Sequence, residues 1–437
     1  MVKHDCFHIR RQQLLAELPE NSIAIVFASK EPKFHRKTIF PFRQDPNFYY
    51  LTGFPEPEAI AVFIPKRAEG EYVLFTLDKN PDEEVWTGTR VGQEAAINKY
   101  GAHQAFSLSE IETIFPDLLV GKETIYFPLD DHEDYERVIH WTKILVGQDR
   151  NGINLPTDFI DINKILYEMR LIKDEDEIKT LRKAVNITAS AQVRMIKTCK
   201  PNIMEYELEA EIQHEFFRHG GRMPSFEPIV ASGANTCILH YTHNDQQLKS
   251  GNLLLADIGV EYHSYAGDIT RTIPINGKFS PEQKAIYEAV LETQLRVIKH
   301  IKPGIRWNEL QEIAIESITS NLLKLKLLKG KLTDLIATKA YTPFYMHKIS
   351  HWLGIDVHDV GRYKLNSAWR KLKPGMVLTI EPGIYIAAGL PVDKKWWNIG
   401  VRIEDDILVT KNGHEVLSSA APKTIAEIEQ LMRHSSK

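Results

Sequence analysis

The feature that most constrains this chain is a pair of aspartates in the otherwise apolar stretch at residues 253–274, LLLADIGVEYHSYAGDITRTIP. The stretch opens on an apolar run that predicts a buried strand, with Asp257 at its end. A turn at residues 259–263 would fold a second strand, which carries Asp268, back onto the first. The two carboxylates would then face one point, where they repel unless a cation lies between them or one is protonated. The alternative is that each aspartate caps a turn or pairs with Arg271.

Three further side chains of the same kind follow downstream. Glu381 comes directly after an apolar strand in LTIEPGIYI, Glu404 lies in VRIEDDILVT, and His351 lies in YMHKISHWLGIDVHDVG. Four carboxylates directed into a sheet interior require more positive charge than one arginine supplies. Two divalent cations would balance them, with His351 as an imidazole ligand. Oxygen-rich ligation without thiolate favours Mn²⁺, with Co²⁺ or Zn²⁺ as alternatives, and a pair of such ions is hydrolytic machinery. The alternative is a set of separate salt bridges.

Other histidines also stand in apolar or glycine-rich settings. His240 lies in CILHYTHN, and His347 and His358 flank the segment that carries His351. These side chains are candidates for stabilising a developing oxyanion or for orienting metal ligands. The remaining histidines considered are assigned to solvated or structural positions: His243, His263, His300 and His414.

Length and composition limit the class of protein. A chain of 437 residues predicts two or three domains, each with its own core. The net charge of −4 and the absence of a long basic block argue against nucleic-acid binding. The three cysteines form no CxxC pair, which argues against a thiolate zinc site and fits the cytoplasm. We see neither a secretory signal nor an apolar run of about 18 residues, and so expect no membrane association.

Hydrophobic periodicity predicts an α/β domain with a mixed sheet in the first part of the chain. One of its helices is expected at residues 109–119, capped by Ser109. The segment at residues 149–156, DRNGINLP, has the composition of a linker. These features place the end of the first domain near this segment.

The second half predicts an α+β arrangement, a largely antiparallel sheet flanked by helices. A long helix is expected from Asp174 to about residue 200 and another over residues 205–218, followed by strands and by helices at about residues 281–301 and 308–328. The lysine-rich end of the last helix resembles a membrane-surface segment. We interpret it as a helix end with Gly330 as its cap.

With these residues identified, the chain resembles the Xaa-Pro aminopeptidases (aminopeptidase P) of the pita-bread metallopeptidase superfamily. The resemblance covers almost the whole chain and rests on motifs that occur in the family's order: FPFRQDPNFYYLTGFPEPEA, ADIGVEYHSYAGDITRTIPINGKF, MHKISHWLGIDVHDVG, GMVLTIEPGIYI and VRIEDDILVT. It implies an α/β N-terminal creatinase-like domain at residues 1–165. An α+β catalytic pita-bread domain would occupy residues 166–437.

The resemblance also implies a dinuclear site, usually of manganese. By analogy, Asp268 and Glu404 bridge both ions, Asp257 serves one ion, and His351 and Glu381 serve the other. Glu381 would in addition carry the proton of a hydroxide that lies between the two metals.

On the substrate side, the resemblance gives His240 and His358 the task of steadying the tetrahedral intermediate. His347 and Arg402 would border the pocket for proline. The superfamily implies a homo-oligomer, a tetramer or a dimer. Trp86, in EEVWTGTRVGQ, matches a tryptophan that in bacterial relatives reaches a neighbouring subunit's active site.

One stretch departs from the family pattern. Many members carry an aspartate shortly before the PFRQ motif, where this chain has His35, Arg36, Lys37 and Thr38. The family's inter-subunit contacts at the entrance of the site are therefore not carried over to this chain. Arg150 falls near an arginine that the family uses there.

The expected activity is metal-dependent release of the N-terminal residue from peptides with proline at the second position. The alternative is a prolidase, which has the same ligands but cleaves Xaa-Pro dipeptides only. Methionine aminopeptidases share the ligands but lack this N-terminal domain. Pita-bread binding modules and creatinases lack the ligands, all five of which are present here.

Overall fold

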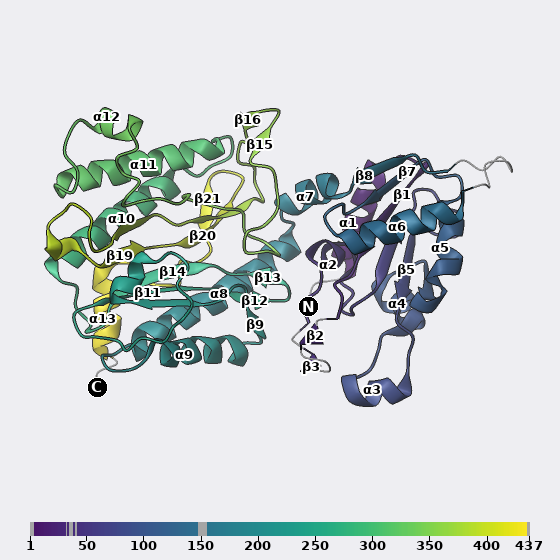
Figure 1. The fold of residues 1–437 in the computed structure, drawn as a ribbon, viewed down its shortest axis with the longest axis horizontal. Helices are drawn as coiled ribbons and strands as arrows, with labels where there is room; N and C mark the ends of the chain where they lie inside the picture. The colour runs from purple at the N-terminus through teal and green to yellow at the C-terminus, as the bar shows by residue number, and fades with distance from the viewer. Residues whose placement is uncertain (1–3, 32, 35–37, 40–41, 147–154, 435–437) are drawn as a thin grey trace. The chain divides into compact units, whose positions relative to one another are not determined.

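The computed structural model describes residues 4–31, 33–34, 38–39, 42–146 and 155–434 (Figure 1). The chain divides after Arg170 into an N-terminal and a C-terminal unit, and the division falls within helix α7 (Asn163–Leu171). The expected domain boundary between residues 165 and 166 stays a prediction. Most of the expected linker lies outside the described residues, as do all of His35, Arg36, Lys37 and Arg150.

The N-terminal unit is built on a mixed six-stranded sheet in the order β6-β5-β4-β1-β7-β8. β1 pairs antiparallel with β4 and parallel with β7. Short, wholly apolar runs such as IAVF predict strands that are buried on both faces, which they are. The strands are β1 (Ser22–Phe27), β4 (Ile60–Phe63), β5 (Tyr72–Thr76), β6 (Gln104–Ser107), β7 (Thr124–Phe127) and β8 (Asp158–Asp161), beside a small hairpin of β2 (Lys33–Phe34) and β3 (Thr38–Ile39).

Helices cover this sheet. Phe115 and Trp141 bring α5 and α6 together on the sheet, with ring centroids 4.1 Å apart. The predicted cap at Ser109 is wrong, because the Ser107 hydroxyl accepts the backbone N–H of Ser109 and starts a short 3₁₀ turn before α5. The helices are α1 (His4–Glu17), α2 (Pro46–Thr52), α3 (Pro81–Thr87), α4 (Gly92–Tyr100), α5 (Ile111–Leu119) and α6 (His132–Ile144).

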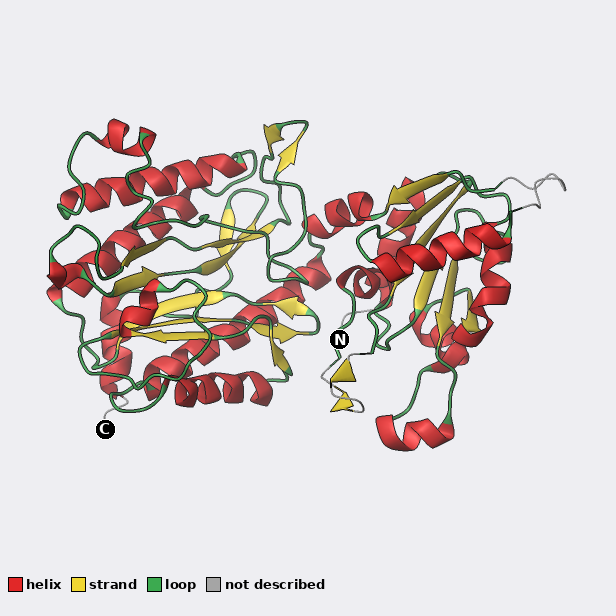
Figure 2. Cartoon of the chain, in the orientation of Figure 1, coloured by secondary structure: helices red, strands yellow, loops and turns green. Residues whose placement is uncertain are grey.

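In the C-terminal unit the strands lie between two pairs of helices (Figures 1 and 2). One pair is α8 (Glu175–Thr198) with α9 (Glu205–Arg218), and the other is α10 (Pro281–His300) with α11 (Trp307–Lys324). The acidic start of α8 is a capping box, since Asp174 and Glu177 exchange side chain-to-backbone hydrogen bonds. The smaller helices are α12 (Leu332–Ala337) and α13 (Ile425–His434).

The predicted end of α11 is wrong. The helix stops at Lys324, and Lys326 takes a positive φ of 60°. The backbone N–H groups of Leu327 and Leu328 then bond back to the carbonyl of Leu322. This closes the helix several residues before Gly330, as left-handed helix ends do.

The strands of the C-terminal unit form short sheets around two long hairpins. The first hairpin joins β11 and β12 to β13 and β14, and the second joins β17 and β18 to β19 and β20. Among the described residues, no helix combines the length and apolar character needed to cross a bilayer. The strands are β9 (Met223–Pro224), β10 (Ile229–Ser232), β11 (Leu253–Ile258), β12 (Val260–Tyr262), β13 (Tyr265–Ala266), β14 (Ile269–Pro274), β15 (Lys364–Leu365), β16 (Ala368–Trp369), β17 (Val377–Ile380), β18 (Gly383–Ile386), β19 (Ile399–Arg402), β20 (Asp405–Val409) and β21 (His414–Val416).

Candidate metal centre

The register of the first hairpin places Asp257 and Asp268 on one face. Asp257 pairs with Thr270 across the β11–β14 ladder. Asp268 lies two residues before Thr270, and side chains two apart in a strand share a face. The predicted turn at residues 259–263 is wrong: the chain reverses at His263 and Ser264, both at positive φ, as a two-residue hairpin turn requires. In this longer hairpin the two aspartates still lie on the same face, as predicted.

The second hairpin aligns the two glutamates. The β17–β20 ladder ends with Ile380 opposite Asp405, and the β18–β19 ladder begins with Gly383 opposite Arg402. The same register runs through the gap, so Glu381 and Glu404 stand opposite each other. Directly paired residues in an antiparallel ladder have Cβ atoms about 5 Å apart.

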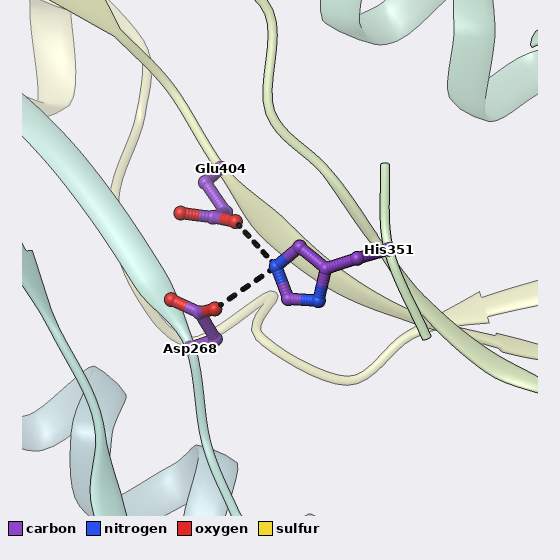
Figure 3. A group of neighbouring side chains, drawn as sticks. All are labelled: Asp268, His351 and Glu404. Atoms are coloured by element: carbon purple, nitrogen blue, oxygen red, sulfur yellow. Dashed lines mark ion pairs between the residues drawn. The ribbon is translucent and has the colours of Figure 1, made fainter. Parts of the chain in front are cut away.

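His351 faces the carboxylates from an irregular loop. Its Nε2 atom lies 3.4 Å from Asp268 Oδ2 and 4.0 Å from Glu404 Oε1 (Figure 3), and 3.9 Å from Glu381 Oε1. Its Nδ1 atom lies 2.9 Å from the carbonyl oxygen of Trp352. Because a carbonyl only accepts, Nδ1 carries a proton, and Nε2 is the ring nitrogen that faces the carboxylates. A histidine whose Nδ1–H is held by a backbone carbonyl offers Nε2 to a metal ion.

The carboxylates are short of positive partners. One oxygen of Asp257 accepts from Arg402 at 2.7 Å, but the other oxygen, like Oδ1 of Asp268, is buried without a hydrogen-bond partner among the described residues. Burial is the main cause that raises the pKa of Glu404 to about 7, and the charge of Asp257 is the second. Desolvation is likewise the main cause that raises the pKa values of Asp268 and Glu381, and the charge of Glu404 is the second cause for both. Ligand atoms of Asp268, His351 and Glu404 lie within 4.8 Å of one another, so these residues fit a bound cation.

These side chains open on a cavity of about 1140 Å³ in the C-terminal unit. Its lining includes His240 and His358, both exposed to the cavity, and the His358 ring packs edge-on against His351 with centroids 4.3 Å apart. Its lining also includes residues from the start of α11 and from the β15–β16 hairpin, with Trp307 and Trp369. The cavity thus offers exposed imidazoles beside the carboxylates and room well beyond them.

Arg402 and His347 are linked through Tyr385. The Tyr385 hydroxyl lies 3.0 Å from Arg402 Nη1 and 2.9 Å from His347 Nε2. His347 Nδ1 lies 2.8 Å from the carbonyl of Lys348, so Nδ1 donates and Nε2 accepts the tyrosine proton. Burial, with Arg402 nearby, lowers the pKa of His347 to about 4. The chain of hydrogen bonds therefore contains a neutral imidazole.

The structure brings all the predicted site residues to this cavity except Trp86. Trp86 belongs to the N-terminal unit, where α3 leaves it 87% exposed. Sequence reasoning missed Tyr385 and Thr270, whose hydroxyl donates to Glu404 Oε2 at 2.7 Å. Both lie inside the strand motifs that carry the ligands, and that position was the available signal.

Behind the centre lies a buried ion-pair network that the sequence analysis also missed. Arg271 Nη2 lies 2.8 Å from Asp405 Oδ1, and Arg271 Nη1 donates to the Glu404 carbonyl. Asp405 also pairs with Lys423, while Asp406 Oδ2 accepts the backbone N–H of Asp268 at 3.1 Å. The network fixes the backbone of two of the carboxylate residues. Arg271 therefore pairs with Asp405, and not with Asp257 or Asp268.

Comparison with known proteins assigns the chain to a family. Residues 179–411 match metallopeptidase family M24, and residues 7–126 match the aminopeptidase P N-terminal domain. The Xaa-Pro aminopeptidase of Escherichia coli K12 is 43% identical over 98% of this chain and 97% of its own, and that of Haemophilus influenzae is 42% identical over 98% and 96%. The predicted fold class, an α/β creatinase-like domain followed by an α+β pita-bread domain, is confirmed.

Solved structures agree. The aminopeptidase PepP of Pseudomonas aeruginosa superposes with a TM-score of 0.98 at 47% identity over 100% of both chains. Escherichia coli aminopeptidase P with the inhibitor Pro-Leu gives 0.96 at 42% identity over 100% of this chain and 99% of that one. A metallopeptidase requires a divalent metal, and the group of Asp268, His351 and Glu404 offers a site for one. The chain therefore belongs to metallopeptidase family M24 and is a hydrolase of the Xaa-Pro aminopeptidase group.

Proposed function

We propose that the centre holds two Mn²⁺ ions, with Asp257, Asp268, His351, Glu381 and Glu404 as ligands. The observation that carries this proposal is the position of His351 Nε2, which lies within 4.0 Å of the carboxylates of Asp268, Glu381 and Glu404. Oxygen-rich ligands with one imidazole favour Mn²⁺ over softer ions, and Co²⁺ or Zn²⁺ also fit the set. When bound, such ions supply an activated water and polarise the scissile carbonyl.

Within this reaction Glu381 is the proton carrier. Desolvation, together with the charge of Glu404, raises the pKa of its carboxyl toward the range in which a carboxyl both accepts and donates a proton. The proline nitrogen of the scissile bond is a tertiary amide and must be protonated before it leaves. Glu381 therefore takes the proton of the attacking water and passes it to that nitrogen.

The exposed imidazoles bind the reacting carbonyl. His240 and His358 line the cavity beside the carboxylates. A ring N–H directed at the oxygen that becomes negative in the tetrahedral intermediate stabilises the transition state. Removal of one such donor typically lowers kcat by about 10²–10³.

The proline side chain lies against His347 and Arg402. The Arg402–Tyr385–His347 hydrogen bonds hold these side chains in place while leaving the neutral His347 ring as an uncharged surface. The nitrogen of a proline residue has no N–H to donate, so the uncharged His347 ring suits the pyrrolidine as a neighbour. This pocket selects proline at the second position.

Cleavage of peptides longer than two residues is favoured over prolidase activity. The cavity volume of about 1140 Å³ exceeds the roughly 300–1,000 Å³ of sites for drug-sized ligands. The closely similar relatives bear the name Xaa-Pro aminopeptidase. The physiological peptide would therefore extend beyond proline toward Trp307 and Trp369.

We also propose a homo-oligomer, a tetramer or a dimer, in which Trp86 contributes to a neighbouring subunit's site. The support is that α3 has no buried residue and exposes both Val85 and Trp86. An exposed apolar pair on one short helix suits a protein interface.

Two further proposals concern the cellular location and the domain boundary. The free cysteines, Cys6, Cys199 and Cys237, suit the cytoplasm, and cell fractionation tests this. Residues 1–165 and 166–437 would be the two domains, and separate expression of each part tests that boundary.

The activity test compares metal-stripped protein, restored with Mn²⁺, on an Xaa-Pro dipeptide and on a longer Xaa-Pro-Yaa peptide. We expect Mn²⁺-dependent release of only the first residue, with higher kcat/KM for the longer peptide. Activity on the dipeptide alone would make the protein a prolidase. Folded protein that is inactive on both peptides would contradict the enzyme assignment. Asp268→Asn is the control variant that lacks one metal ligand.

A further inference from the structure

Two buried glutamines on different helices donate hydrogen bonds to the backbone next to the carboxylate residues of the metal centre. Gln192 lies on α8 and Gln294 on α10, helices that lie on opposite sides of the strands (Figure 1). Both side chains are completely buried. Neither touches the cavity, and neither belongs to the residues named above.

Gln192 bridges the two strands of the first hairpin. Its Nε2 atom donates to the carbonyl of Ala256 at 3.1 Å and to that of Ile269 at 2.7 Å. Ala256 directly precedes Asp257, and Ile269 directly follows Asp268. One amide therefore ties the backbone on either side of this carboxylate pair.

Gln294 repeats the arrangement on the second hairpin. Its Nε2 atom donates to the carbonyls of Ile380 at 3.3 Å and Ile403 at 3.1 Å. These residues directly precede Glu381 and Glu404. Lys423 donates to Gln294 Oε1 at 3.0 Å, which fixes the orientation of the amide.

We propose that Gln192 and Gln294 are positioning residues that set the spacing of the four carboxylates and thereby the affinity for metal. The inference rests on the proposed function, because it assumes that these carboxylates bind divalent ions. Like charges repel, so each hairpin tends to open at the carboxylates before an ion binds. An amide that offers two N–H groups to two strands opposes that opening and keeps the ligands near their bound geometry.

The competing explanation is that each amide merely satisfies buried carbonyl groups. The two explanations differ in what a substitution changes. Loss of a purely structural hydrogen bond lowers stability alone. Loss of a positioning hydrogen bond also weakens metal binding, typically by 10–100-fold for residues behind the ligands.

The chain offers a matched control. Gln283 also lies on α10, is 7% exposed, and donates from Nε2 to the carbonyl of Gly251 at 2.8 Å. Gly251 precedes β11, at the end opposite to Asp257. The control variant Gln283→Met thus removes a part-buried amide–carbonyl bond, together with the capping bond from the Ser280 N–H, from the same helix without touching a carboxylate pair.

The experiment measures Mn²⁺ affinity by calorimetric titration of metal-stripped protein, together with urea unfolding and steady-state kinetics. We expect Gln192→Met and Gln294→Met each to weaken Mn²⁺ binding about 10-fold, while Gln283→Met loses stability but keeps its affinity. At saturating Mn²⁺ the kcat of both variants returns toward the wild-type value. Gln192→Asn and Gln294→Asn, which withdraw the amide by one methylene group, serve if the methionine variants fail to fold.

The outcomes separate the two proposals. Wild-type affinity in the Gln192 and Gln294 variants, with stability lowered as in Gln283→Met, would overturn the positioning role alone. A wild-type protein that binds no Mn²⁺ and cleaves no peptide would overturn the proposed function, and this inference with it.

Discussion

Lys173 and Asp359 form an ion pair inside the C-terminal unit, with Nζ 2.7 Å from Oδ2 and each side chain only 1% exposed. Asp359 directly follows His358. A Cβ atom added at Gly354 would lie 2.1 Å from Asp359 Oδ2, so the carboxylate is packed tightly against the loop backbone. The pair therefore anchors the loop that carries His351 and His358.

Removal of one partner of this pair should be strongly destabilising. Lys173→Met removes the ammonium group that neutralises a buried carboxylate, and we expect a loss of about 3–5 kcal/mol in the free energy of unfolding, measured with urea. Glu415→Gln, which breaks the exposed Arg182–Glu415 pair, should lose no more than about 1 kcal/mol. Equal losses in the two variants would show that Asp359 is solvated.

Metal should stabilise the folded protein measurably. The four carboxylates of the centre repel one another without a cation, so Mn²⁺ at 100 times its dissociation constant should add about 2.7 kcal/mol to the free energy of unfolding. Urea unfolding of metal-stripped protein with and without Mn²⁺ measures the difference. His351→Ala should abolish most of the gain, and an undiminished gain in that variant would place the ion elsewhere.

The Tyr385 hydroxyl should matter for the reaction. It joins Arg402 to His347, and a hydrogen bond to a charged group contributes about 1.5–3 kcal/mol. Tyr385→Phe should therefore lower kcat/KM by about 10-fold or more. Tyr265→Phe removes a buried hydroxyl that donates to Glu177 at 3.0 Å, outside the cavity lining, and should leave kcat/KM unchanged. A similar loss in both variants would point to general destabilisation.

Asp134 should make stability depend on pH in the N-terminal unit. Burial, with Asp131 nearby, raises the pKa of Asp134 to about 6, whereas an unfolded aspartate titrates near 4. The folded state thus binds more protons in this window, and its stability falls as the pH rises from about 4 to 6.

Asp134→Asn lacks this titration, so its stability relative to the wild type should increase between pH 4.5 and pH 7. Urea unfolding at both values measures the change. Glu94→Gln, at an exposed position in the first turn of α4, controls for the loss of a charge. A pH-independent difference for Asp134→Asn would disprove the raised pKa.

Trp86 should be required for assembly. Its 87% exposure in a single chain leaves a large apolar surface in water. Trp86→Ser should shift the protein toward smaller species in sedimentation velocity and lower its activity. Val146→Ser, at another exposed apolar position, is the control. An unchanged sedimentation profile in Trp86→Ser would remove this residue from the interface.

The carboxylates of the centre were predictable because charged residues at the ends of apolar strands leave a local signature. Asp257 and Glu381 each close such a run. The turn at His263 and Ser264 was missed because the nearby Gly259 carries the stronger turn signal, while neither residue is a usual choice for positive φ.

The residues that support the centre from behind have no comparable signature in the sequence. Lys173 lies 186 positions from Asp359, and Gln192 lies 64 and 77 positions from the residues whose carbonyls it binds. Hydropathy patterns record which face of an element is buried and say nothing of which partner it meets. Such pairings emerge only once the helices have packed against the strands.

The unbroken register between β17–β18 and β19–β20 limits how the chain can change length. One residue inserted or deleted within either ladder would send Glu381 or Glu404 to the opposite face of the sheet. The connection at residues 387–398 lies outside both ladders and is free of this restriction. A change of chain length in that connection therefore leaves Glu381 and Glu404 on the same face, so the second hairpin can lengthen there without loss of the carboxylate pair.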